Sequence, residues 1–177
     1  MTPGRPARNV EVKARVADLS ALRARVARRA TAPPTTLNQV DTFFRVARGR
    51  LKLRRFDDGA GELIYYERRD TDGPRTSTYT IAPCADARAV ELVLAAALGV
   101  RGIVAKHREV FLVDRTRVHL DDVEGLGQFL ELEVVLAGDE PPTEGERVAR
   151  ELLAALEVPG DALVAPAYID LLLDAAR

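Results

Sequence analysis

Charged residues alternate with apolar ones in two segments near opposite ends of the chain, Val10–Val16 and Phe129–Val135. Residues two apart share one face of a β-strand, so Glu131 and Glu133 lie together, and Glu11 lies on the charged face of the first segment. Carboxylate oxygens are ligands that Mg²⁺ and Mn²⁺ prefer, and carboxylates grouped without a cation repel one another. These acids therefore predict a divalent metal site.

Basic residues show the same alternation in the segments 50–54 and 106–108. The chain contains 23 arginines but only three lysines, and Lys13, Lys52 and Lys106 all lie in such charged segments. A lysine ammonium is a compact charge that approaches phosphate without the planar geometry of a guanidinium. The separation of acids and bases onto different strands predicts a polar cavity with metal against one wall and phosphate against another.

The pattern along the chain predicts eight strands in hairpin order. We expect strands at 9–16, 38–47, 50–56, 62–68, 75–82, 102–113, 115–121 and 128–136, and helices at 17–29, 86–98, 143–156 and 167–175. Eight strands suit a closed barrel, so the predicted fold is α+β, an eight-stranded antiparallel closed β-barrel (a tunnel) with a charged interior and helices outside. The alternative is a sheet whose charged face lies in water. The amphipathic helices need the apolar strand faces, which favours the barrel.

Composition limits the class of protein. The 27 acids and 26 bases give a net charge of −1, so the chain lacks the excess of positive charge that is typical of nucleic-acid-binding proteins. Cys84 is the only cysteine, so a disulfide framework is excluded. Neither a signal peptide nor a membrane-spanning apolar stretch is recognisable. We expect one cytoplasmic domain over residues 1–177, with residues 1–8 disordered, no nucleic-acid or membrane partner, and a monomeric or homodimeric state.

Six segments occur in an order that resembles a known family. They are Asn9–Lys13, Asp41–Phe44, Leu51–Arg54, Lys106–Glu109, His119–Glu133 and Ala167–Leu172. Together they resemble the CYTH family, also called triphosphate tunnel metalloenzymes, whose founding members are class IV adenylyl cyclases and thiamine triphosphatases. The first segment is similar to the family's Glu-x-Glu-x-Lys signature, with Asn9 in place of the first glutamate. The local sequence is closest to the class IV adenylyl cyclase-like branch.

The resemblance implies a tunnel that binds a triphosphate together with Mg²⁺ or Mn²⁺, and it implies roles for the matched positions. The metal ligands would be Glu11, Asp121, Glu131 and Glu133. The phosphate chain would be held by Lys13, Lys52, Arg54, Lys106 and Arg108, with Arg75, Arg117 and His119 as further substrate-binding residues. The catalytic residues would be Glu11, Lys13 and Glu133. His107 alternates away from its basic neighbours and is expected to point outward.

Two positions depart from the family pattern. Asn9 makes the metal site one charge weaker, although its carbonyl oxygen remains a possible ligand. Glu67 falls where many relatives carry a phosphate-binding lysine, so either Arg68 substitutes for that lysine after a local shift, or this wall prefers another substrate. Tyr65, Tyr66 and Tyr79 could stack on an organic ring or serve only in packing.

Three functions are therefore expected from the sequence. The first is a metal-dependent enzyme most like a class IV adenylyl cyclase, which converts ATP to cyclic AMP and pyrophosphate. The second is a triphosphatase that hydrolyses inorganic triphosphate, thiamine triphosphate or a nucleoside triphosphate. The third is a non-catalytic module that binds polyphosphate or nucleotide, and Asn9 and Glu67 are the residues that favour it.

Overall fold

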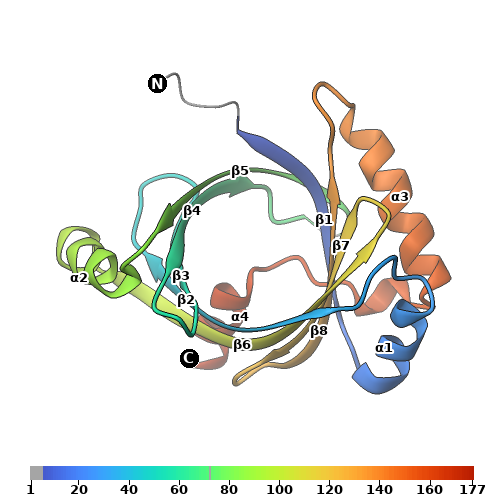
Figure 1. The fold of residues 1–177 in the computed structure, drawn as a ribbon, viewed down its shortest axis with the longest axis horizontal. Coiled ribbons are helices and arrows are strands. Elements are labelled where there is room, and N and C mark those ends of the chain that lie inside the picture. The colour runs from blue at the N-terminus through green and yellow to red at the C-terminus, as the bar shows by residue number, and fades with distance from the viewer. Residues whose placement is uncertain (1–5, 72) are drawn as a thin grey trace.

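The computed structural model describes residues 6–71 and 73–177. In chain order its elements are β1 (Ala7–Arg15), α1 (Leu19–Ala27), β2 (Thr35–Phe44), β3 (Arg50–Arg55), β4 (Gly61–Arg68), β5 (Arg75–Cys84), α2 (Ala87–Leu98), β6 (Val100–Val113), β7 (Thr116–Val123), β8 (Gly127–Val135), α3 (Pro142–Ala155), the 3₁₀ turn η1 (Gly160–Ala162) and α4 (Tyr168–Ala175). The strands form a ring with helices around it (Figure 1). Among the described residues, no helix combines the length and apolarity needed to span a membrane.

The eight strands close into one antiparallel barrel, as the sequence predicts. The strand order around the ring is β1-β5-β4-β3-β2-β6-β7-β8, and β8 pairs with β1 to complete it. Long stretches of β1 and β8 pair residue by residue, from Asn9 opposite Val135 to Arg15 opposite Phe129. Closure removes the free strand edges and turns one face of every strand toward a common interior.

The hydrophobic core lies between the outside of the barrel and the helices. Leu22 of α1 and Leu153 of α3 pack in one cluster with Val12 and Leu132, whose side chains leave the outer face of β1 and β8. A second cluster joins Leu53 of β3 to α2. Because the apolar faces of the strands are covered by helices, the charged faces point into the barrel. The alternative of a charged face in open water is therefore wrong for this chain.

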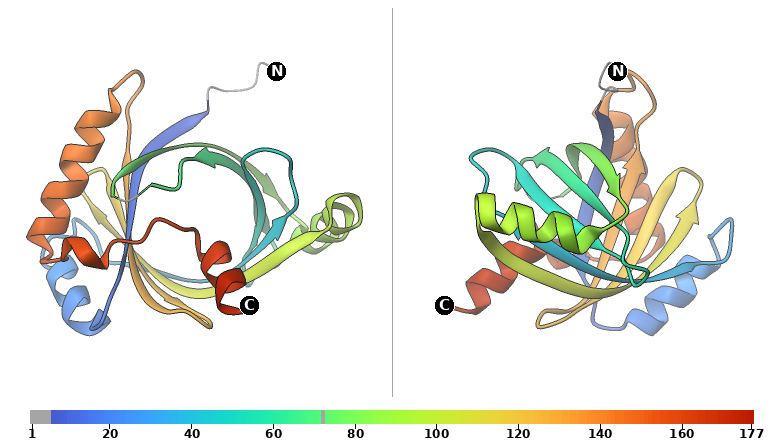
Figure 2. Two further views of the ribbon diagram at one scale, coloured as in Figure 1. Left: turned by 180° about the vertical axis from the view of Figure 1, so that it is seen from behind. Right: turned by 60° about the vertical axis from the view of Figure 1, so that its left-hand side comes forward.

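The C-terminal segment crosses one end of the barrel (Figure 2, left). Val164 donates a backbone hydrogen bond to the carbonyl of Lys13 at 2.9 Å, and the Lys13 ammonium donates to the carbonyl of Pro166, also at 2.9 Å. Asp170 of α4 accepts hydrogen bonds from Arg50 and Arg101 at 2.9 and 2.6 Å. These contacts hold α4 against this end, and the opposite end stays open.

The observed bounds differ from the predicted ones mainly at two places. Strand β2 spans Thr35–Phe44 rather than 38–47, because the pairing with β6 shifts between Phe43 and Phe44 and the strand ends there. Ala7 and Arg8 belong to β1 and lie opposite Tyr79 and Thr78, so the predicted disorder of residues 1–8 is wrong for these two. Residues 1–5 lie outside the described part of the chain.

We expect Gly145→Ala to destabilise the fold, because α3 lies too close to the barrel at this residue. An added Cβ would lie 2.7 Å from Val10 Cγ2 and 2.8 Å from Leu136 Cδ2. Overpacking of this kind costs about 1–3 kcal/mol and outweighs the roughly 1 kcal/mol that alanine gains in helix propensity. A thermal melt should show a lower Tm. Gly160→Ala is the control, since nothing lies within 4 Å of the added Cβ, and an unchanged Tm for Gly145→Ala would contradict the close docking of α3.

Candidate active site

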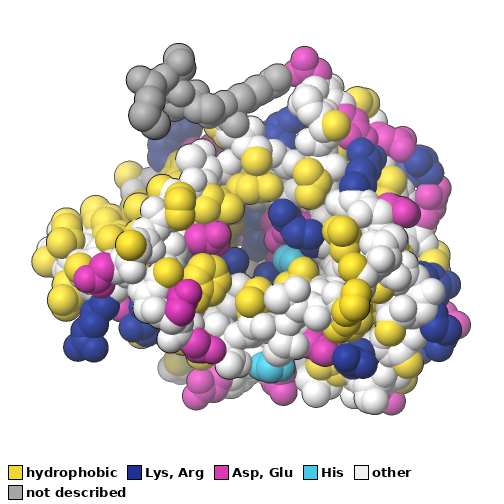
Figure 3. Space-filling model, in the orientation of Figure 1, with side chains coloured by type: hydrophobic (Ala, Val, Ile, Leu, Met, Phe, Trp, Pro, Cys, Tyr) yellow, Lys and Arg dark blue, Asp and Glu magenta, His cyan; other side chains and the backbone are white. Residues whose placement is uncertain are grey.

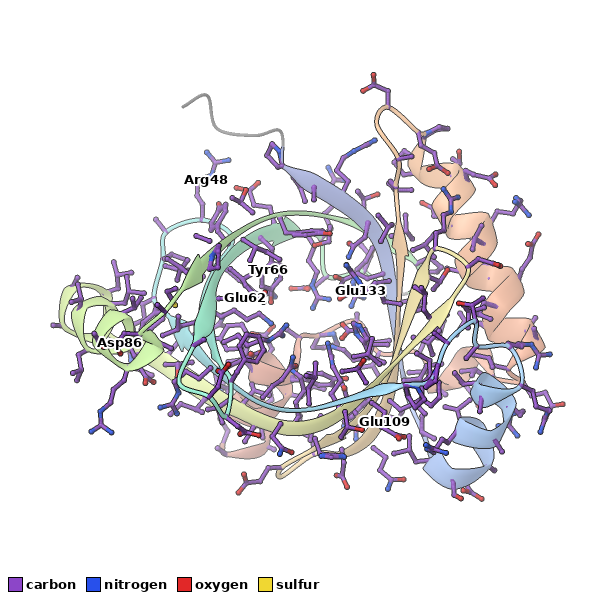
Figure 4. The ribbon with its side chains drawn as sticks, in the orientation of Figure 1. Arg48, Glu62, Tyr66, Asp86, Glu109 and Glu133 are labelled. Atoms are coloured by element: carbon purple, nitrogen blue, oxygen red, sulfur yellow. The ribbon has the colours of Figure 1, made fainter. Side chains whose placement is uncertain are left out.

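The interior of the barrel is a polar cavity of about 310 Å³ to which every strand contributes. A space-filling view down the barrel shows basic, acidic and histidine side chains inside the hollow (Figure 3). Glu62, Tyr66 and Glu133 point inward, whereas Glu109 lies on the outside (Figure 4). Ten predicted site residues line the cavity, namely Glu11, Lys13, Lys52, Arg54, Lys106, Arg108, Arg117, His119, Glu131 and Glu133.

The acids and bases do not occupy separate walls, contrary to the sequence-based expectation. Glu131 lies opposite Lys13 on one neighbouring strand and opposite His119 on the other. Glu133 lies between Glu11 and Arg117 in the same way. The Arg117 guanidinium donates to Glu133 at 2.9 Å. Strand pairing therefore places each carboxylate of β8 beside a basic or imidazole side chain.

Three potential metal ligands gather at one place in the cavity. The nearest ligand atoms of His119, Glu131 and Glu133 all lie within 4.8 Å of one another. His119 Nδ1 is 3.6 Å from Glu131 Oε2 and 3.9 Å from Glu133 Oε1, distances too long for hydrogen bonds. His119 Nδ1 is buried and has no hydrogen-bond partner among the described residues, so it is available as a ligand.

Both carboxylates of this cluster are held in the charged form. Burial alone would raise the pKa of Glu131, but His119 and Arg108 hold it well below its usual range. Burial likewise opposes ionisation of Glu133, and His119 and Arg117 lower its pKa. Two carboxylates and an imidazole form a donor set that suits Mn²⁺ and also accepts Mg²⁺. The residues present therefore fit a divalent cation.

Asn9 and Glu11, the remaining polar residues of the first motif, differ in their surroundings. Asn9 Oδ1 is buried and accepts no hydrogen bond within the described part of the chain, which leaves it free to serve as an oxygen ligand. The Glu11 carboxylate instead accepts a hydrogen bond from Arg68 and lies 3.5 Å from Arg75 Nε. Glu11 is not part of the three-residue cluster.

Asp121, predicted as a metal ligand, has a different environment. It is fully buried, lies outside the cavity lining, and accepts two hydrogen bonds of 2.6 Å from Arg108. Tyr168 of α4 donates a third hydrogen bond to it at 2.9 Å. Arg108 also donates to Glu131 at 2.8 Å. Asp121 thus orients the guanidinium of Arg108, and the structure does not bring it together with the three-ligand cluster.

Asp41 organises the basic side chains, a role that the sequence analysis did not assign. Its buried carboxylate accepts hydrogen bonds from Lys52 at 2.8 Å, Arg54 at 2.9 Å and Lys106 at 3.1 Å. Burial opposes ionisation, but Arg54, Lys106 and Lys52 hold the pKa of Asp41 well below its usual range. The alternation of Gln39, Asp41 and Phe43 along β2 is the sequence signal that could have placed Asp41 in the interior.

The alternation of β4 settles the position of Arg68. The Arg68 side chain is 3% exposed, lines the cavity and reaches Glu11. The Glu67 side chain is 49% exposed, and it accepts a hydrogen bond from Tyr65 at 2.5 Å on the outside. Of the two alternatives for this wall, the structure favours the first, because Arg68 faces the cavity and Glu67 does not. His107 is exposed and contacts Asn38, so its predicted outward orientation is confirmed.

Arg75 is the second predicted residue outside the cavity lining. It is 4% exposed and lies behind Arg68 and Glu11, where it donates a hydrogen bond to the carbonyl of Thr71 at 2.9 Å. Its Nε and Nη2 atoms, like those of Arg68, are buried and donate no hydrogen bond within the described residues. Buried donors without an acceptor are costly, and an anion in the cavity would satisfy those of Arg68, which lines it.

We expect triphosphate binding to weaken at alkaline pH because of Lys106. Burial is the main cause that lowers the pKa of Lys106; Asp41 raises it, Arg108, Arg54 and Lys52 lower it, and together these leave the pKa at about 7. The free protein therefore loses this positive charge as the pH rises through 7, and the affinity for inorganic tripolyphosphate should fall by up to about tenfold per pH unit. Calorimetric titration in EDTA between pH 6 and pH 9 measures this.

The matched variant for this titration is Lys106→Arg, because arginine keeps its charge over the whole range. Its tripolyphosphate affinity should decline less steeply above pH 7 than that of the wild-type chain. An identical pH dependence in the two proteins would show that another group causes the decline.

Comparison with known proteins agrees with this geometry. The solved structures that resemble this chain include the protein PH1012 of Pyrococcus horikoshii, with a TM-score of 0.80, 22% identity and coverage of 92% of this chain and 98% of that one. A provisionally assigned adenylate cyclase of Vibrio parahaemolyticus has a TM-score of 0.76 and 17% identity, with coverage of 93% of this chain and 97% of that one. The Hippeastrum protein HpAC1 has a TM-score of 0.66 and 15% identity, with coverage of 94% of this chain and 96% of that one. It is provisionally assigned as an adenylyl cyclase and is described as having a dominant triphosphatase activity.

These identities are low enough that the similarities establish the fold alone. The search of curated proteins finds no match. The sequence profile of the CYTH domain, however, matches residues 7–168. This range contains all eight strands, every residue of the three-ligand cluster and the basic residues around Asp41. Because the match covers most of the chain and confirms the resemblance seen in the sequence, the protein belongs to the CYTH domain family.

Proposed function

We propose that this chain is a divalent-metal-dependent enzyme that cleaves a triphosphate held in the barrel. The observation that carries this proposal is the charge of the cavity. Seven basic side chains line it against five carboxylates, and a divalent cation at His119, Glu131 and Glu133 would add two further positive charges. The resulting excess is close to the roughly four negative charges of a nucleoside triphosphate, which phosphoryl-transfer sites must neutralise.

The orientation of the basic groups supports the same proposal. Asp41 keeps Lys52, Arg54 and Lys106 gathered within hydrogen-bond distance of one carboxylate. Asp121 fixes the guanidinium of Arg108 on the side of the three-ligand cluster. Side chains that are positioned before the substrate arrives stabilise developing charge without reorganisation. The unpaired donors of Arg68, which lines the cavity, would meet phosphate oxygens.

His119, Glu131 and Glu133 would hold the metal ion, with Asn9 Oδ1 as a further oxygen donor. When bound, such an ion lowers the pKa of a nearby water or hydroxyl group and polarises phosphoryl oxygens. The residues of the chain supply the remaining requirements. Lys52, Arg54 and Lys106 would bind the phosphate chain, and Arg117 would keep Glu133 ionised and oriented.

Two reactions fit this arrangement. Adenylyl cyclisation is the one that the sequence resemblance favours: the ribose 3′-oxygen attacks the α-phosphorus, its proton leaves, and pyrophosphate departs. Hydrolysis is the second candidate, in which water attacks the terminal phosphorus and loses its protons, the bond to the bridging oxygen breaks, and the diphosphate part leaves while orthophosphate forms. The dominant triphosphatase activity of the similar Hippeastrum protein favours this second reaction.

Product analysis distinguishes these reactions. The purified chain would be incubated with ATP or inorganic tripolyphosphate, with Mn²⁺ or Mg²⁺, and the products separated by chromatography. Cyclic AMP with pyrophosphate identifies a cyclase, whereas orthophosphate identifies a triphosphatase. Tight binding of both compounds with no product under any of these conditions would contradict the proposed enzyme and leave the non-catalytic binding module. Incubation in EDTA is the metal-free control and should give no product.

A further inference from the structure

The end of the barrel opposite α4 is lined partly by apolar side chains. Ile64 of β4 lies directly opposite Ile81 of β5, and Leu37 of β2 and Val110 of β6 line the same cavity. We call these four residues the apolar collar. They lie toward the beginnings of β2 and β4 and the ends of β5 and β6, which meet at the open end because neighbouring strands are antiparallel. Yellow apolar surface is visible around the hollow (Figure 3).

The collar presents apolar surface to the open end of a charged cavity. Ile81 lines the cavity and is nevertheless 44% exposed. Tyr79 lies two residues away on the same strand face, and its hydroxyl accepts a hydrogen bond of 3.4 Å from Arg117. A rim that bound only phosphate would gain nothing from these side chains, whereas apolar walls with a few polar groups are typical of sites for organic ligands.

The charges give the site a direction. Glu62 lines the cavity near the open end, opposite Arg54 in the strand pairing. Lys52 comes two residues before Arg54 in β3, and Lys106 comes four residues before Val110 in β6, so both lie further from this end. A carboxylate at the mouth repels the anionic part of a ligand, and the ammonium groups beyond it attract that part. The phosphate chain is therefore drawn inward and an uncharged group remains at the collar.

We propose that the collar binds the organic group of a triphosphate ester, with the size and apolar faces of a nucleoside, and that the site thereby selects esterified over inorganic triphosphate. This inference rests on the proposed function, since it requires the phosphate chain to lie among the basic side chains. Inorganic triphosphate is charged along its whole length and leaves the collar uncovered. A base and sugar cover it, and Tyr79 offers them an aromatic face.

Calorimetric binding of ATP and inorganic tripolyphosphate in EDTA tests this inference without turnover. The wild-type chain should bind ATP at least about tenfold more tightly, although tripolyphosphate carries more charge. Ile81→Ser should raise the Kd for ATP by about three- to tenfold and leave the Kd for tripolyphosphate within about twofold. Val110→Ser repeats the test at a second collar position. Ile103→Ser is the matched control, because Ile103 is 53% exposed and lies outside the cavity lining.

The outcomes separate this inference from the function on which it rests. If both compounds bind the wild-type chain equally, or tripolyphosphate binds more tightly, the collar does not select and the inference is overturned while the proposed function stands. If both collar variants weaken the binding of ATP and of tripolyphosphate equally, or weaken the binding of neither, the collar is likewise not a site for an organic group. If neither compound binds the wild-type chain in EDTA and neither is cleaved in Mn²⁺, the proposed function itself fails.

Discussion

Glu133→Gln is expected to reduce turnover of a triphosphate by at least about a hundredfold. The substitution keeps the size of the side chain and removes the charge that lies beside His119 and Arg117. A lost metal ligand costs several kcal/mol of transition-state stabilisation, and each 1.36 kcal/mol corresponds to about tenfold in rate. Product release from ATP and tripolyphosphate in Mn²⁺, together with calorimetric Mn²⁺ binding, measures the two consequences separately.

The matched control for this variant is Glu144→Gln. Glu144 lies in the first turn of α3, outside the barrel, and pairs with the exposed Arg147. The same chemical change there should leave both turnover and Mn²⁺ affinity unaltered, since exposed ion pairs contribute little. Full activity of Glu133→Gln with unchanged Mn²⁺ affinity would refute a metal site at His119, Glu131 and Glu133.

The side chains that face the interior follow from local geometry, and this part of the site could be predicted from the sequence. In a strand the alternation of faces depends only on neighbouring residues, so Lys106 and Arg108 point inward and His107 outward, as observed. The closed barrel also follows from the pattern within each strand, because helices cover the apolar faces of the eight strands and the charged faces must then point into a common interior. These features require no knowledge of which strands become neighbours.

Pairing between distant strands could not be predicted in the same way. Asp41 and Lys106 are 65 residues apart and form a hydrogen bond only because β2 pairs with β6. The expectation of separate acidic and basic walls is wrong for the same reason, since pairing in the barrel sets Glu133 beside Arg117. A shift of one residue exchanges the two faces of a strand, which explains why the sequence leaves open whether Glu67 or Arg68 faces the interior.

Asp121 shows that a correctly predicted face does not reveal the partners of the side chain. Its alternation with His119 places both side chains on the inner face of β7, but the carboxylate is enclosed by Arg108 and Tyr168. Tyr168 follows Asp121 by 47 residues, and its position depends on the docking of α4 at one end of the barrel. No pattern within β7 could indicate that contact. We therefore propose that Asp121 positions Arg108, whereas the family resemblance implies metal binding.

Asp121→Asn is expected to lower the free energy of unfolding by about 3 kcal/mol at pH 7. Removal of one partner from a buried ion pair leaves the other charge uncompensated, at a cost of about 3–5 kcal/mol, and Glu131 compensates Arg108 in part. Burial opposes ionisation of Asp121, but Arg108 lowers its pKa, so the carboxylate stabilises the fold above the ordinary pKa of aspartate. This contribution is lost as the pH falls through the lowered pKa of the folded state.

Urea denaturation of the wild-type chain, Asp121→Asn and Asp122→Asn measures the effect. Asp122 is the neighbouring residue, and it is exposed on the opposite face of β7, so its substitution should change the free energy of unfolding by less than about 0.5 kcal/mol. The two assignments of Asp121 predict opposite results for the metal-free protein. If Asp121 positions Arg108, loss of its charge destabilises the metal-free fold. If Asp121 is a metal ligand grouped with other carboxylates, loss of its charge relieves the repulsion between them and stabilises the metal-free fold. Equal or greater stability of Asp121→Asn, combined with weaker Mn²⁺ binding, would restore Asp121 to the metal site.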